Sequence, residues 1–169
     1  VPLSEGIAPR MIDKNEIDPH AWQNLLNGKI YVANIAKALK AALPEKAGQI
    51  DYRAAVYSAE MERLNQLIVD DFAAIPAARR KIITNHEAFG YFGDAYGIVF
   101  VSPIGMNTEA EPSASDVAKL INQIKSEGVK LVFIENMSNP KLIKQIAKDA
   151  GAEMGGELFS DSLSLPGGP

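Results

Sequence analysis

Apolar residues recur every three or four positions along two long stretches in the first half of the chain. Between Ala21 and Leu43 this spacing predicts a helix with one apolar face, which Pro44 ends. A second helix is predicted from Asp51, whose carboxylate can cap its first turn, to Pro76. At about 1.5 Å per residue it would be roughly 36 Å long, more than one lobe of such a chain needs. A helix of that length either crosses a whole domain or joins two lobes, and we favour the second interpretation.

After the second helix, short β-rich runs alternate with capped helical segments. Strands are predicted over 81–84, 98–102, 130–135 and 153–159, and helices over 87–96, 113–127 and 138–150. Ser113 and Ser138 are expected to cap the last two helices, and the strand at 130–135 is apolar enough to be buried on both faces. This alternation predicts an α/β fold with a four-stranded parallel sheet, right-handed crossovers and flanking helices.

Composition narrows the classes of function. The chain has 169 residues, of which 47% are apolar, and its net charge of −4 leaves no basic stripe for a nucleic-acid backbone. Because it contains no cysteine, a transition metal would have to be held by His, Asp or Glu. The apolar runs are only a few residues long, far short of the roughly 20 that span a bilayer. Neither nucleic acid binding nor a transmembrane segment is expected.

Four polar clusters fall where the predicted strands end. The carboxyl ends of parallel strands share one edge of the sheet, and ligands bind beyond that edge. One of the two histidines, His86, lies in the first cluster, and the other, His20, directly precedes the helix predicted from Ala21. The clusters are 85–87, 102–106, 135–136 and 160–162.

Each candidate residue also has a structural interpretation. His20 or His86 taken singly fits a hydrogen-bonded or surface histidine. Asp161 fits a turn residue, Glu135 fits a helix cap or a lysine partner, and Trp22 is expected to be a core anchor. Together, however, two imidazoles and a carboxylate at element ends could converge on a divalent ion. Imidazole nitrogen and carboxylate oxygen suit Zn, Mn or Fe.

Other catalytic signatures are missing from the sequence. It contains no G-x-S-x-G elbow, Walker A sequence, G-x-G-x-x-G fingerprint or H-E-x-x-H helix. His86-Glu87 begins like the last of these, but the second histidine is missing. A metalloenzyme that uses the same His/Asp set, and an interaction module whose histidines are structural, stay open at this point.

Several motifs, in order and spacing, closely resemble one protein family. They are D-P-H-A-W at 18–22, T-N-H-E-A-F-G-Y-F at 84–92 with A-Y-G-I at 95–98, V-F-I-E-N at 132–136 and L-F-S-D-S-L at 158–163. The family is that of the zinc and manganese solute-binding proteins of bacterial ABC importers, the ZnuA/TroA-type or cluster A-I receptors. It includes cell-adhesion-type lipoproteins, and the resemblance covers nearly the whole chain.

The resemblance implies two α/β lobes joined by one long rigid helix, with a metal ion between them. Residues 1–50 would then be the remnant of an N-terminal lobe, 51–75 the linking helix and 76–169 the C-terminal α/β lobe. The family pattern also has an early histidine ligand and a C-terminal helix, which this sequence does not contain. With no initiator Met and no signal-peptide pattern at the start, we expect a fragment shortened at both ends.

The resemblance also implies a site and an activity. His20, His86 and Asp161 would be metal ligands, and Glu135 would support them without binding the ion. The expected function is high-affinity capture of Zn or Mn and delivery to an ABC permease, outside the cytoplasmic membrane, with no catalysis. Three imidazoles and one carboxylate in the intact receptor would favour Zn by intrinsic affinity, although members with this ligand set are linked to either metal.

Overall fold

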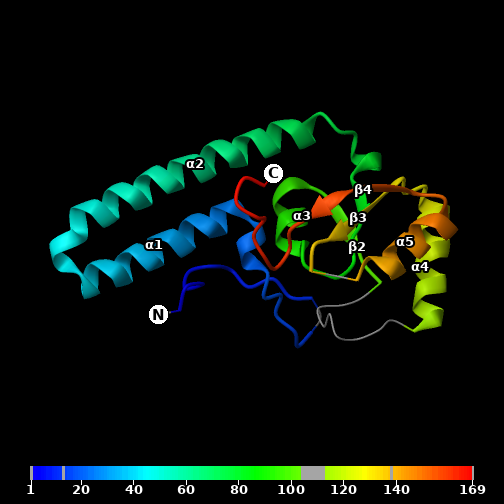
Figure 1. Ribbon diagram of the computed structural model, residues 1–169, viewed down its shortest axis with the longest axis horizontal. Coiled ribbons are helices and arrows are strands. Elements are labelled where there is room, and N and C mark those ends of the chain that lie inside the picture. The colour runs from blue at the N-terminus through cyan, green and yellow to red at the C-terminus, as the bar shows by residue number, and fades with distance from the viewer. Residues whose placement is uncertain (1, 13, 104–112, 138, 169) are drawn as a thin grey trace.

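A helical hairpin and a parallel sheet make up the chain in the computed structural model, which describes residues 2–12, 14–103, 113–137 and 139–168. The hairpin consists of α1 (Leu25–Ala42) and α2 (Ala47–Ala73), joined by the short 3-10 turn η2 (Pro44–Lys46). The two helices lie side by side and extend away from the sheet (Figure 1). No helix in the described part of the chain is long and apolar enough to cross a membrane.

The start of α1 follows the expected chemistry, whereas the start of α2 does not. A short 3-10 turn, η1 (Ala21–Gln23), precedes α1, and the side chain of Asn24 accepts a hydrogen bond from the backbone N of Leu26 at 2.8 Å. The prediction that Asp51 caps α2 is wrong. The helix begins four residues earlier because η2 leads directly into it, and the Asp51 carboxylate pairs with Lys40 of α1 at 2.6 Å.

Helix α2 leads from the hairpin to the first strand. It has 27 residues and is therefore about 40 Å long. It ends at Ala73, just before Ile75-Pro76, where the proline disfavours helical geometry in the residue that precedes it. A short 3-10 turn, η3 (Ala77–Arg79), then leads into the sheet.

The predicted four-stranded parallel sheet is confirmed. Its strands are β1 (Lys81–Ile83), β2 (Val99–Val101), β3 (Leu131–Glu135) and β4 (Glu153–Leu158). They lie in the order β2-β1-β3-β4 with all pairings parallel. The order places the ends of β1 and β3 next to each other, and those are the strands that precede His86 and contain Glu135.

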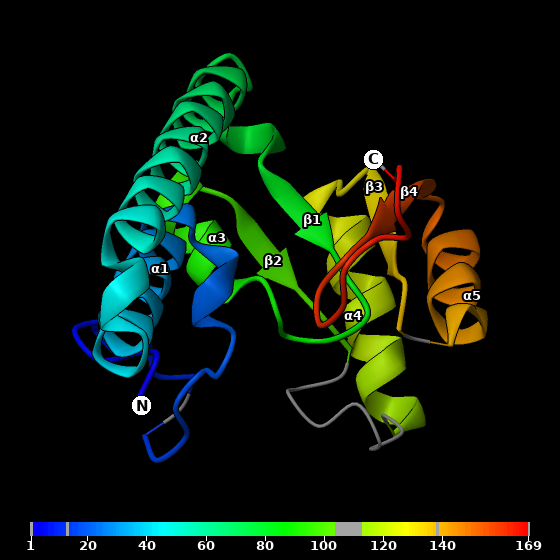
Figure 2. The same ribbon diagram turned by 60° about the vertical axis from the view of Figure 1, so that its left-hand side comes forward.

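Three helices flank the sheet: α3 (Gly90–Tyr96), α4 (Ala114–Glu127) and α5 (Pro140–Ala150). Figure 2 shows α4 and α5 on the side of the sheet away from the hairpin, with α3 on the hairpin side. The buried core lies between the sheet and the α4–α5 pair and consists of Ile83, Leu120, Ile124, Val129, Val132, Ile143, Ile146 and Ala147.

Strand β3 is less buried than its apolar sequence predicts. Val132 and Glu135 are fully enclosed, but Leu131 is 42% exposed and Phe133 and Ile134 are half-buried. The reason is that α4 and α5 cover one face only, because α3 packs against β2, η1 and α2 rather than β3. The expectation of burial on both faces therefore holds for only part of this strand.

The helix ends in the second half mostly follow the expected capping. Ser113 caps α4, and Gly128 and Gly151 adopt the left-handed conformation that ends α4 and α5. Asn139 caps α5; the residue predicted for this role, Ser138, lies outside the described residues. Helix α3 begins at Gly90 rather than Glu87, because the preceding residues form the loop that contains His86.

Candidate metal centre

The three residues predicted as metal ligands meet at the junction between the N-terminal segment and the sheet. His20, His86 and Asp161 each offer one ligand atom, and these atoms all lie within 4.8 Å of one another. His20 Nε2 is 3.6 Å from Asp161 Oδ1, and His86 Nε2 is 3.3 Å from Asp161 Oδ2. The two imidazole rings are 5.5 Å apart, centre to centre. Three donors from distant parts of the sequence therefore face one small volume.

His20 is held by the residue two positions before it. Both its backbone N and its ring Nδ1 lie within hydrogen-bond distance of Asp18 Oδ1, at 2.9 and 2.8 Å. A carboxylate only accepts hydrogen bonds, so Nδ1 must carry the proton. The lone pair of the imidazole is then on Nε2, the atom that faces Asp161. The sequence analysis assigned Asp18 no role. Its position two residues before His20 was the feature that could have indicated a hydrogen bond to the histidine.

His86 is held in the same way by a residue from another strand. It lies in the loop after β1, and its backbone N donates to Glu135 Oε1 at 2.9 Å, while its Nδ1 contacts Glu135 Oε2. Glu135 is at the end of β3, and its own backbone N donates to Asn85 Oδ1 at 3.0 Å. Both side chains are almost fully buried. Glu135 is thus neither a helix cap nor a lysine partner.

The surroundings of His86 and Glu135 favour a positive charge on the imidazole and a negative charge on the carboxyl group. Burial alone would lower the pKa of His86, but the carboxylates of Glu135 and Asp161 outweigh it and raise that pKa above its usual value. Burial alone would raise the pKa of Glu135, but contacts from the His86 side chain and backbone, with Ser160, lower it overall. His86 Nε2 is buried and faces Asp161 Oδ2 at 3.3 Å. In the metal-free chain the raised pKa of His86 favours a proton on Nε2, and a metal ion bound there would take the place of that proton.

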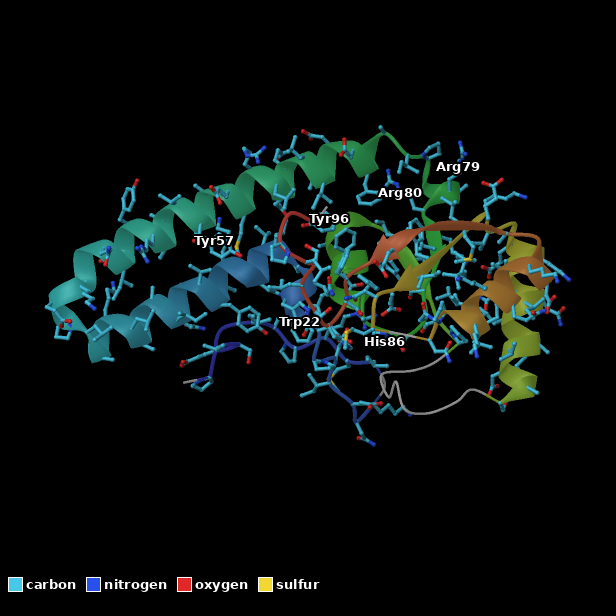
Figure 3. The ribbon with its side chains drawn as sticks, viewed as in Figure 1. Trp22, Tyr57, Arg79, Arg80, His86 and Tyr96 are labelled. Atoms are coloured by element: carbon cyan, nitrogen blue, oxygen red, sulfur yellow. The ribbon has the colours of Figure 1, made fainter. Side chains whose placement is uncertain are left out.

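Trp22 does not anchor a core, contrary to prediction. It is 45% exposed, and its indole Nε1 donates to the backbone oxygen of Ser160 at 3.1 Å. The side chain of Gln23 donates to the same oxygen at 2.9 Å. The indole also contacts the His20 ring edge-on, with centroids 5.3 Å apart. The hydrogen bond of the indole N–H, rather than the apolar area of the ring, holds Trp22 next to Ser160. Figure 3 labels Trp22 on the same side of the sheet region as His86.

The polar clusters predicted at 135–136, 160–162 and 102–106 differ in how they are connected to the candidate site. Asn136 contacts the hydroxyl of Ser162, one residue after Asp161, so the clusters after β3 and β4 are joined. In the cluster at 102–106, Ser102 lines a cavity of about 390 Å³ that also borders His86, and residues 104–106 lie outside the described part of the chain. The ligand-bearing edge is therefore built by β1, β3, β4 and the segment before η1.

Two histidines and a carboxylate are thus gathered where the parallel sheet meets the N-terminal segment. The family model described as "zinc-uptake complex component A periplasmic", ZnuA, matches residues 1–169. The chain belongs to this family, and the match gives no support to the metalloenzyme alternative.

Relatives with solved or curated descriptions agree with this membership. The chain is 33% identical to the iron ABC transporter substrate-binding lipoprotein MtsA of Streptococcus pyogenes serotype M1, over 93% of the chain and 51% of MtsA. It is 33% identical to the manganese ABC transporter substrate-binding lipoprotein PsaA of Streptococcus pneumoniae, over 89% of the chain and 48% of PsaA. The chain thus spans about half the length of these relatives.

The fold is also that of a solved binding protein. The periplasmic zinc binding protein TroA of Treponema pallidum superposes with a TM-score of 0.94 at 29% identity, covering 99% of this chain and 64% of TroA. The likeness extends over the hairpin and the sheet alike, because nearly the whole chain is matched.

Proposed function

We propose that this chain forms part of an ABC importer's binding protein, and that His20, His86 and Asp161 capture a divalent transition metal as cargo. One observation carries the proposal most directly. Each imidazole has a carboxylate on its Nδ1 and turns its Nε2 toward the same third residue, Asp161. Carboxylates behind ligating histidines fix the ring orientation and raise the basicity of the ligand nitrogen.

The donor set favours transition metals over Mg and Ca. Two imidazole nitrogens and a carboxylate oxygen suit Zn, Mn and Fe, whereas Mg and Ca prefer oxygen ligands. The names of the relatives differ, since MtsA is named for iron, PsaA for manganese and TroA for zinc. We propose Zn or Mn as the cargo, with the intrinsic order of affinities favouring Zn.

The domain roles follow from the resemblance described above. We propose that 1–50 belongs to an N-terminal lobe, that the helix predicted over 51–75 links the lobes, and that 76–169 forms the C-terminal lobe. An ion bound by both His20 and the sheet residues would stabilise their close approach. Release to an ABC permease would follow when the permease moves these elements apart. The periplasmic and lipoprotein names in the family support a location outside the cytoplasmic membrane.

Calorimetric titration of the chelator-stripped chain with Zn²⁺ and Mn²⁺ tests the metal site. We expect saturable one-to-one binding that weakens more than about 100-fold in each of His20→Ala, His86→Ala and Asp161→Ala, since groups that merely support ligands already cost about 10–100-fold. Asp71→Ala, on the exposed face of α2, is the matched control. Ligand variants that bind like the unmodified chain would move the site elsewhere.

Uptake by whole cells tests the transport role separately. Cells that carry the full-length gene with His86→Ala should accumulate less zinc or manganese than cells with the Asp71→Ala gene. Equal accumulation would contradict delivery through this site.

A further inference from the structure

We infer that Arg10 is a positioning residue for His20, acting through Asp18. The effect on metal binding rests on the function proposed above, whereas the effect on the His20 ring does not. Arg10 touches none of the proposed ligands directly: its contacts are with Asp18, with helix α3 and, at 4.0 Å, with the Glu87 carboxylate in the loop before α3.

A small antiparallel turn brings Arg10 next to Asp18. Met11 and Ile17 form an isolated antiparallel bridge, and the backbone N of Asp18 donates to the Arg10 oxygen at 2.9 Å. The turn therefore places the Arg10 side chain beside the carboxylate that precedes His20, although the two residues are eight positions apart in sequence.

The two oxygens of Asp18 have separate tasks. Oδ1 faces both nitrogens of His20, the backbone N and Nδ1, and Oδ2 accepts from Arg10 Nη1 at 3.0 Å. The Asp18 side chain is fully buried, so this carboxylate depends on Arg10 for its opposite charge. With Oδ2 fixed by the guanidinium, the carboxylate is oriented so that Oδ1 stays on the His20 ring.

Helix α3 is shaped to hold the guanidinium. Arg10 Nε donates to Asp94 at 3.0 Å, and its backbone N donates to the Tyr91 hydroxyl at 2.7 Å. At Gly90 a Cβ atom would lie only 2.3 Å from Arg10 Cζ and Nη1, so glycine leaves the space that the guanidinium fills. Arg10 thus connects the segment of His20 to an element of the sheet region.

The consequence is a fixed proton position on His20. While Asp18 Oδ1 accepts from Nδ1, the imidazole stays in the form with its lone pair on Nε2, ready for a cation. Without Arg10 the Asp18 carboxylate can rotate away, and the proton can move to Nε2, which blocks the nitrogen that faces Asp161.

Nitrogen NMR of the histidine rings tests this directly, since the chain has two histidines and therefore few signals to assign. In the metal-free chain at mildly alkaline pH, we expect His20 to be protonated on Nδ1. Arg10→Gln should shift a measurable share of His20 to the form protonated on Nε2 and leave the His86 signals unchanged, with Arg10→Lys in between. Zn²⁺ affinity should fall about tenfold in Arg10→Gln.

Gly90→Ala provides an independent variant, because the added methyl group displaces the guanidinium without removing it. It should reproduce the Arg10→Gln shift. Arg79→Gln, at an exposed arginine on η3, is the matched control, and urea unfolding checks that every variant folds. A His20 ring unchanged in Arg10→Gln, or changed equally in Arg79→Gln, would overturn the inference. If the unmodified chain binds no zinc, the proposed function fails, yet the ring signals still decide the role of Arg10.

Discussion

The two histidines of the proposed centre have the same surroundings built by different means. His20 receives its carboxylate from Asp18, two residues earlier, and His86 receives its carboxylate from Glu135, 49 residues later. Asp18 relies on Arg10, whose side chain is 25% exposed, whereas Glu135 is enclosed at the end of β3. One half of the site is therefore made by a local turn and the other by the sheet.

The difference teaches where function and stability can be separated. Removal of Asp18 from the local half leaves Arg10, whose side chain is partly exposed and can be solvated. A change in the sheet half uncovers a buried ion pair next to the main-chain pairing of β1 and β3. We expect mutations of equal chemistry to give unequal losses of folding free energy in the two halves.

Glu135→Ala should have the largest effect. It leaves His86 without its buried partner, and removing one member of a buried pair costs about 3–5 kcal/mol. Asp18→Ala should cost clearly less, because Arg10 can be solvated. Urea unfolding of both variants measures the free energies, and equal losses would remove the distinction between the halves.

Asp18→Asn should separate binding from stability. The amide keeps the shape of the carboxylate but loses the charge that orients both Arg10 and His20. We expect Zn²⁺ affinity to fall about 10–100-fold by calorimetry while the unfolding midpoint stays close to that of the unmodified chain. Asp71→Asn serves as the control; a loss of stability without a loss of affinity would reverse this assignment.

The pH dependence of metal-free stability should reveal the sheet half. The raised pKa of His86 contributes stability that is full below its unfolded value near 6.5 and lost as the pH rises through the folded value. The lowered pKa of Glu135 contributes stability above its unfolded value that is lost as the pH falls through the folded one. The pair should therefore stabilise the chain most between these limits.

The matched variant for this pH profile is Glu135→Gln. It should abolish the decline of stability on the alkaline side, because His86 then loses its main charged partner. Urea unfolding across the pH range gives the profile, and an identical alkaline decline in Glu135→Gln would assign it to other groups.

Gln23→Ala should give the smallest loss of folding free energy. It tests the hydrogen bond by which the segment after His20 contacts Ser160, the residue before Asp161. It removes one of the two donors on the Ser160 oxygen, a net loss of about 0.5–1.5 kcal/mol. We expect metal to dissociate a few times faster in stopped-flow chelator competition. Gln66→Ala on α2, whose amide pairs with Asp70, is the control and should leave the rate unchanged.

The sequence predicted the parts of the molecule that depend on local periodicity and on chain order. Alternating strands and helices fixed the parallel sheet, and the carboxyl end of β1 put His86 at its edge. Periodicity could not show that His20 lies near this edge, because that contact depends on how the N-terminal segment folds back. The family resemblance, rather than the pattern, joined His20 to Asp161 before the structure did.

The failed expectations for Asp51 and Trp22 share one cause, which is competition from a tertiary partner. Asp51 could cap a helix, but Lys40 across the hairpin takes its carboxylate. Trp22 could fill a core, but the Ser160 oxygen holds its indole near the surface. Arg10 drew no attention in the sequence, because nothing local shows that Asp18 and Asp94 surround it.

Trp22 makes the proposed centre optically visible. It is the single tryptophan of the chain, it contacts His20 and its indole nitrogen donates to the residue before Asp161. All indole fluorescence therefore originates where the N-terminal segment meets the β4 end of the sheet. A paramagnetic ion such as Mn²⁺ held there would quench that emission, whereas Zn²⁺ would alter it only through the contacts of the indole with His20 and Ser160, so one intrinsic fluorophore distinguishes occupancy by the two proposed cargo metals.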